Sequence, residues 1–276
     1  MIKKKSDDAA ATIEIMEIEM VTADFCILGS RPLLMNRLGE KARQELLLPA
    51  RKKNRAERET SLKHDPVAEY RSALNQFGND DQPTRLFLPG RAFSLAMASA
   101  ALDIPGASKA EISRLTQVTD IQVPVWGIPT LFMDVVRLAG IVKVPDIRSR
   151  GLLEKWACKL TVRYMKNRLT LASVARLLAA SGQIVGVGDY RVQRSGLYGS
   201  YQLVSSDDPE WQEIVNTQGR EAQDAAIENP TPYDDSTAEL FTWFENEADR
   251  REKTPTASKS NGSRQPKSRV KDLENA

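Results

Sequence analysis

The chain has 276 residues, of which 41% are apolar and 28% are charged, so it is long enough for one sizeable core. It has no run of about 18 uninterrupted apolar residues and no signal-peptide core, and we therefore expect a cytoplasmic protein without a membrane partner. Its two cysteines and single histidine occur without a zinc, nucleophile or phosphate-loop motif. We accordingly expect no enzyme activity, no metal and no cofactor.

The net charge of +2 hides a strong asymmetry along the chain. Residues 1–206 carry 30 Lys and Arg against 21 Asp and Glu, a net +9; residues 207–250 carry 2 against 13, a net −11; residues 251–276 carry 7 against 3, a net +4. A basic body favours a polyanionic partner, and the acidic segment could occupy the same surface when that partner is absent. A solvated charged surface would produce the same counts.

The first part of the body is predicted to contain a strand, a charged insertion and a strand–helix pair. Residues 12–28 alternate apolar and polar with one slip, which predicts a long strand with one buried face. A charged insertion follows at about 37–80 and closes with a short helix at 66–77, while His64 lies in a polar stretch and is expected to face solvent. Residues 86–101 predict a short strand, a Pro-Gly turn and a helix dense in small residues.

The second part of the body predicts mostly strands. Three short strands are expected between 115 and 138, then a loop at 144–151, a strand at 156–164, a helix at 170–181 and a last strand at 197–204. The order strand, helix, strands, helix, strand is the ferredoxin-like pattern of an α+β fold, with insertions.

The sequence divides into a body at 1–205, an acidic segment at 206–250 and a basic tail at 251–276. The tail is too polar to bury a core and is expected to be disordered. In the acidic segment, Ser-Thr-Ala-Glu at 236–239 resembles a capping box that opens a short helix. That helix carries Leu240, Phe241, Trp243 and Phe244, which dock on the body or bind a partner.

Residues 182–201 are the most distinctive stretch, because they hold five of the 15 glycines together with three tyrosines and two arginines. Glycine allows positive φ and close approach of a backbone, arginine binds phosphate with two parallel hydrogen bonds, and tyrosine offers a face for base stacking. The composition predicts a loop that contacts a nucleic-acid backbone. A tight hairpin that binds nothing has the same composition.

Two stretches resemble the RAMP proteins of CRISPR effector complexes. In residues 88–96, an apolar residue, Pro89 and Gly90 open the first helix, and residues 182–201 are similar to the terminal glycine-rich loop of that family. The chain departs from the family pattern at 91–92 and 95–96, where Ser-Ser and Lys-Gly are replaced by Arg-Ala and Leu-Ala, and in the insertion at 189–191. Residues 32–37 and 186–191 also resemble uncharacterised phage proteins.

The resemblance implies an RNA-recognition-type core over about residues 12–205, with a thumb-like insertion. Such a core binds the backbone of single-stranded RNA as one subunit of an oligomer or multi-subunit ribonucleoprotein. Relatives that cleave their target use an aspartate after the first strand, where this chain has Asn36, so we expect no nuclease activity. The candidate nucleic-acid ligands are basic, aromatic and glycine residues: Arg31, Arg37, Arg91, Arg148, Arg150, Arg163, Tyr164, Gly186, Gly188, Tyr190, Arg191, Arg194 and Tyr198.

Two other functions stay open at this point. A phage-type single-stranded DNA-binding or annealing protein would use the same basic and aromatic surface, because discrimination through the 2′-hydroxyl cannot be inferred from sequence. An assembly protein would instead use the glycine-rich stretch and the helix near residue 240 for subunit contacts, and it would bind no nucleic acid.

Overall fold

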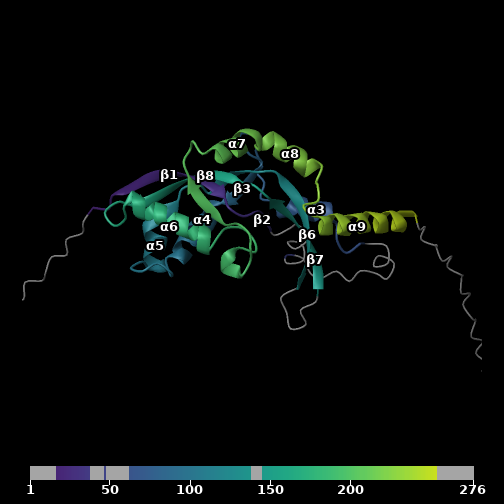
Figure 1. Cartoon of the computed structure of the whole chain (residues 1–276), viewed down its shortest axis with the longest axis horizontal. Coiled ribbons are helices and arrows are strands. Elements are labelled where there is room, and N and C mark those ends of the chain that lie inside the picture. The colour runs from purple at the N-terminus through teal and green to yellow at the C-terminus, as the bar shows by residue number, and fades with distance from the viewer. Residues whose placement is uncertain (1–16, 38–46, 48–61, 138–144, 254–276) are drawn as a thin grey trace, which may run out of the picture.

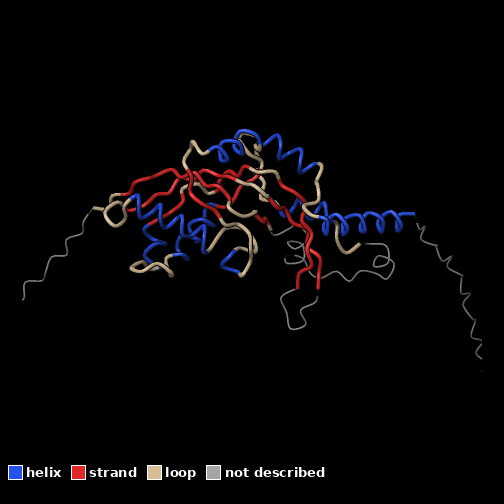
Figure 2. The backbone as a smooth tube through the Cα atoms, in the orientation of Figure 1, coloured by secondary structure: helices blue, strands red, loops and turns tan. Residues whose placement is uncertain are grey.

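The computed structural model describes residues 17–37, 47, 62–137 and 145–253. Over these ranges the chain is an α+β protein with antiparallel sheets (Figures 1 and 2). Its elements are β1 (Met20–Gly29), β2 (Leu33–Met35), α3 (Pro66–Ala73), β3 (Leu86–Pro89), α4 (Gly90–Ala100), α5 (Lys109–Leu115), β4 (Thr116–Val118), β5 (Gln122–Trp126), β6 (Pro129–Arg137), β7 (Pro145–Leu153), β8 (Ala157–Met165), α6 (Leu171–Ile184), the 3-10 turn η1 (Val192–Arg194), β9 (Tyr201–Val204), α7 (Pro209–Thr217), α8 (Arg220–Glu228) and α9 (Asp235–Lys253).

The larger sheet, sheet A, has the strand order β3-β5-β8-β1-β9, and β4 also pairs with β8. Alternation along β1 and β8 sends Ile27 and Leu160 to one face, where they are buried together with Phe93 of α4 and Leu178 of α6. Helices α4, α5 and α6 lie on this side of the sheet (Figure 1). Small residues such as Ala96 let α4 pack closely, as its composition predicts.

The opposite face of sheet A is partly covered by α7. Trp211 and Ile214 of this helix are buried against Leu28 of β1 and Ala157 of β8. Figure 1 shows α7 and α8 on the side of the sheet away from α4 and α6. The predicted acidic segment at 206–250, expected to hold one short helix, contains α7, α8 and most of α9, and all three helices contact the body.

The third of these helices, α9, contains the four apolar side chains that the sequence singled out. Leu240 and Phe241 pack against the main core, and the backbone N–H of Met133 donates to the hydroxyl of Thr237 at 3.3 Å. Trp243 is 64% exposed. The N-terminal turns of α9 dock on β6, and the helix then extends away from the body (Figure 1).

The smaller sheet, sheet B, has the order β2-β7-β6. The structure corrects the loop predicted at 144–151. These residues belong to strand β7, because their polar residues pair across the sheet instead of forming a turn. Arg150 lies opposite Phe132 and Arg148 opposite Asp134. When the inward positions of a strand are polar and have partners in the protein, the sequence lacks the apolar–polar alternation by which strands are recognised.

His64 is held between two carboxylates, which corrects the expectation of a solvent-facing side chain. Its Nδ1 lies 2.7 Å from Glu69 Oε1 and its Nε2 lies 2.9 Å from Asp146 Oδ1. The imidazole thereby joins the start of α3 to the start of β7. Most of the predicted charged insertion before residue 62, the first part of the predicted strand at 12–28, and the basic tail beyond 253 lie outside the described residues.

Gln223 of α8 is buried and shows that α8 belongs to the fold. Its Oε1 accepts from the backbone N–H groups of Arg85 at 2.7 Å and Leu86 at 3.1 Å. Its Nε2 donates to the carbonyls of Val125 at 2.8 Å and Gly127 at 3.0 Å. One side-chain amide thus satisfies the backbone around the β3–β5 edge of sheet A.

We expect Gln223→Ala to lower the free energy of unfolding by about 2–3 kcal/mol, because it leaves buried backbone groups without partners. Glu221→Ala, an exposed change on the same helix, should alter it by less than about 0.5 kcal/mol. Urea unfolding followed by circular dichroism measures both. Equal unfolding midpoints for the two variants would show that α8 contributes no such hydrogen bonding.

Candidate functional site

The glycine-rich loop, residues 185–200, connects α6 to β9 and is hydrogen-bonded to β2 and to Pro32, the residue before it. The N–H of Gly199 donates to the carbonyl of Pro32 at 2.7 Å, and that of Asp189 donates to Leu34 at 2.8 Å. Gly199 has φ of +70°, and a Cβ there would lie 1.7 Å from the carbonyl oxygen of Val187. At Gly188, with φ of +81°, a Cβ would lie 2.7 Å from the oxygen of Leu34. Both glycines are therefore needed for the backbone of the loop to make these close approaches.

Arg150 ties this loop to sheet B. Its side chain is only 2% exposed, and its two terminal nitrogens each lie 3.2 Å from a carboxylate oxygen, one of Asp134 and one of Asp189. The same oxygen of Asp189 accepts from Asn36 Nδ2 at 2.8 Å. The guanidinium also lies 5.0 Å from the ring centre of Tyr190. Arg150 is therefore engaged inside the protein and is not a free phosphate ligand, which corrects its assignment from sequence.

Aromatic side chains surround this guanidinium. The ring centre of Phe132 lies 5.6 Å from the guanidinium carbon, and the rings of Tyr198 and Tyr233 meet Phe132 edge-on at 6.1 and 6.0 Å. Burial raises the pKa of Tyr198. Tyr190, with φ of +45°, is 39% exposed. Tyr190 and Tyr198 thus keep part of their rings at the surface, where a base could stack.

Tyr164 does not belong to that surface. It lies on the same face of β8 as Leu160 and Val162, and it is 7% exposed within the main core. Its predicted role in stacking is therefore wrong in this structure. Arg163, its neighbour on β8, points to the other face and is exposed, but it lies on sheet A rather than on the glycine-rich loop.

The remaining predicted arginines share an electrostatic property. None has a carboxylate within ion-pair distance among the described residues, and all are exposed except Arg191, which is half-buried. Arg191 is held by neutral groups, with Nη2 3.2 Å from Gln193 Oε1 and Nη1 3.4 Å from the oxygen of Gly188. The set consists of Arg31, Arg37, Arg91, Arg148, Arg163, Arg191 and Arg194.

Five of these arginines flank the glycine-rich loop. Arg191 and Arg194 belong to it, Arg31 and Arg37 border the chain segment to which it is hydrogen-bonded, and Arg91 is in the first turn of α4, the helix that lines a cavity together with the loop. Guanidinium groups without carboxylate partners attract anions.

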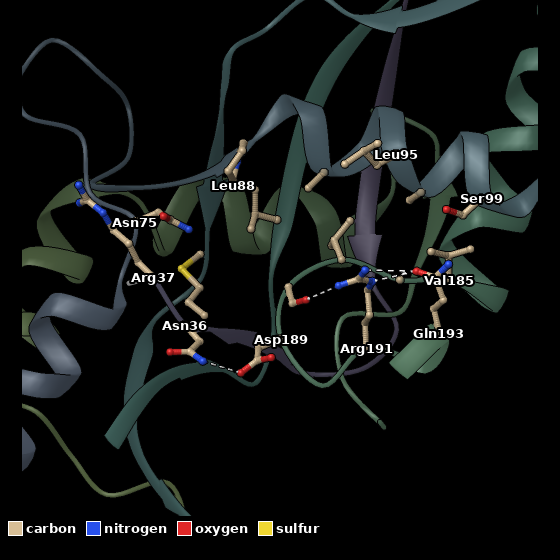
Figure 3. Close-up of a pocket in the computed structure, with 17 residues that line it drawn as sticks. Asn36, Arg37, Asn75, Leu88, Leu95, Ser99, Val185, Asp189, Arg191 and Gln193 are labelled. Atoms are coloured by element: carbon tan, nitrogen blue, oxygen red, sulfur yellow. Dashed lines mark hydrogen bonds between the residues drawn. The ribbon is translucent and has the colours of Figure 1, made fainter. Parts of the chain in front are cut away.

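A cavity of about 390 Å³ opens between α4, the chain after β2 and the glycine-rich loop (Figure 3). Arg37, Gly186, Gly188 and Arg191 are the predicted residues that line it. Its other walls come from residues to which the sequence assigned no role: Asn75, Leu95, Ser99 and Gln193 among them. The Leu-Pro-Gly start of α4 was the only sequence signal that pointed toward these walls.

The described residues contain no helix long and apolar enough to cross a membrane. The same residues hold no group of three His, Cys, Asp or Glu side chains arranged to bind a metal ion. Burial raises the pKa of both Cys26 and Cys158, which disfavours the thiolate form of each. The sequence matches no protein-family model, and a search of curated proteins found no significant match.

We expect Arg150→Lys to destabilise the protein by about 2 kcal/mol, because an ammonium lacks the planar fork that reaches both Asp134 and Asp189 and the flat face that contacts aromatic rings. The loss is smaller than for a fully buried pair, since both carboxylates are partly exposed. Arg148→Ala, two residues away on the same strand and exposed, should change stability by less than about 0.5 kcal/mol. Thermal and urea unfolding compare the two. A stable Arg150→Lys variant would contradict the bridging role.

Proposed function

We propose that the protein binds the sugar–phosphate backbone of single-stranded nucleic acid, most readily RNA, without cleaving it. The observation that carries the proposal is the cluster of arginines without carboxylate partners around the glycine-rich loop. Paired arginines such as Arg150 serve the fold, whereas unpaired arginines at the surface are available for phosphate groups. The partly exposed rings of Tyr190 and Tyr198 on the same loop supply faces for bases.

The strand arrangement supports a ferredoxin-like core as part of this proposal. The last strand, β9, lies beside β1, and β8 lies between β1 and β5. Helix α4 lies between β1 and β5 along the chain, and α6 connects β8 to β9. This is the order expected of a split βαβ unit, to which β3 and sheet B are additions.

We propose that the nucleic-acid strand runs along the glycine-rich loop and not across the open face of sheet A. Helix α7 occupies part of that face through Trp211 and Ile214, and Lys159 beside it is paired with Asp24 at 2.9 Å. A nucleic-acid strand that crossed this face would have to displace α7. The edge that carries the glycine-rich loop and its five flanking arginines requires no such displacement.

The resemblance to RAMP proteins motivates the choice of RNA and of a multi-subunit assembly, and both stay predictions. Single-stranded DNA would satisfy the same phosphate contacts, since only contacts to the 2′-hydroxyl discriminate between the two. Matched RNA and DNA oligonucleotides therefore belong in every binding experiment. Stronger binding of DNA than of RNA would favour the annealing-protein alternative.

We expect affinity for a fluorescein-labelled single-stranded oligonucleotide to fall steeply as salt is raised. Each phosphate contact releases a counterion, so several contacts give a log–log slope of several units, at about 0.7 per contact for a single strand. Fluorescence anisotropy across a salt series measures the slope. Absent or salt-independent binding would overturn the proposal.

The double variant Arg191→Ala with Arg194→Ala should weaken binding by roughly 1–3 kcal/mol in total, because charge-assisted contacts to phosphate are lost. Thermal stability should change little, since neither side chain has a carboxylate partner in the described residues. A matched control, Arg114→Ala with Arg176→Ala, removes two exposed arginines from α5 and α6. Equal losses in the two double variants would mean that only net charge matters, and that the loop has no specific role.

A further inference from the structure

We infer that the cavity between α4 and the glycine-rich loop holds one nucleotide of the bound strand, with its base against the apolar wall and a phosphate at each end. The inference deepens the proposed function and rests on it. It follows from the distribution of apolar and charged groups around the cavity.

The middle of the cavity is apolar. Leu88, Ala92 and Leu95 line it from the β3–α4 segment, and Val185 and Val187 line it from the loop. Its volume of about 390 Å³ is at the lower end of the range for small-molecule sites, which suits one nucleotide and not a longer segment. None of the described residues that line it is aromatic, so a base inside would contact aliphatic groups only.

The two ends of the cavity each carry an arginine. Figure 3 shows Arg37 and Asn75 at one end and Arg191 and Gln193 at the other, with Leu88 between them and Leu95 above Arg191. Neither guanidinium has a carboxylate partner among the described residues. Arg191 is already oriented by the oxygens of Gln193 and Gly188, so a phosphate would not have to displace an acidic group.

One carboxylate, that of Asp189, also lines the cavity, but its charge is compensated. It receives hydrogen bonds from Arg150 at 3.2 Å and from Asn36 at 2.8 Å. The buried Arg150 thereby allows an anionic strand to lie beside an acidic residue.

The edge of the base would meet side-chain amides. The Asn75 amide makes no hydrogen bond with any described residue, and the oxygen of the Asn36 amide is likewise without a donor there. Amides that present both donors and acceptors are suited to the edges of unstacked bases. A lone phosphate or sulfate would leave the apolar wall and these amides unused, whereas an apolar ligand would leave the two arginines unused.

The test uses a short oligoadenylate that carries 2-aminopurine at each position in turn. The fluorescence of 2-aminopurine is quenched by stacking on neighbouring bases and rises when the base is removed from the stack. An aliphatic wall would preserve that rise. Anisotropy of a fluorescein on the same strand reports binding separately, so occupancy of the cavity and binding of the strand are distinguished.

Two variants alter the cavity. Ala92→Leu fills its middle, and Ala172→Leu, at an exposed site on α6, is the matched control. Asn75→Ala removes only the unpartnered amide. Its control is Asn79→Ala, which changes an exposed residue in the chain before β3. Circular dichroism verifies that each variant is folded.

We expect the full-length protein to raise the 2-aminopurine signal at one or a few positions. Ala92→Leu should abolish the rise and weaken binding roughly tenfold, Asn75→Ala should weaken binding by a similar factor, and both controls should behave like the parent. Binding of the strand without a fluorescence rise, or a rise that survives in Ala92→Leu, would overturn the inference and leave the proposed function standing. Absence of any anisotropy change would overturn both.

Discussion

The buried guanidinium of Arg150 is the constraint on which the candidate site depends. A charge at 2% exposure must be paired, and its two partners come from β6 and from the glycine-rich loop. Asn36, which follows β2, joins the same carboxylate of Asp189. These contacts combine sheet B, the loop and the chain after β2 into one unit. The loop and the chain after β2, which form two walls of the cavity, are parts of that unit, so their relative positions follow from it.

The contrast between Arg150 and the other predicted arginines explains how one residue type serves both fold and surface. Arg150 has two carboxylates and two rings around it, and removing it would leave acidic groups uncompensated. Arg37 and Arg191 have no acidic partner among the described residues, and they border an apolar cavity. The first arrangement satisfies a buried charge internally. The second leaves charge to be satisfied by something outside the protein.

The acidic C-terminal segment has a different place from the one its charge suggests. Trp211 and Gln223 anchor α7 and α8 to sheet A through apolar packing and backbone hydrogen bonds. Two of its carboxylates pair with cations of the body, Glu210 with Lys155 at 3.1 Å and Asp224 with Arg85 at 3.6 Å. Helices α7 and α8 of the segment therefore cover part of one face of sheet A as part of the fold.

The sequence alone determined the elements whose signal is local. Alternation located β1 and β8, helical periodicity located α4 and α6, and glycine content located the loop between α6 and β9. Six of the eight arginines that it selected are exposed. Only the tertiary structure decided that residues 145–153 form a strand, that Arg150 is buried, and that Tyr164 faces the core. Those outcomes depend on partners distant in the chain: Arg150 pairs with Asp134 and Asp189, and α4 meets Asn75 and Gln193 at one cavity. Pairing across such separations is set by packing, which leaves no periodic trace in the residues themselves.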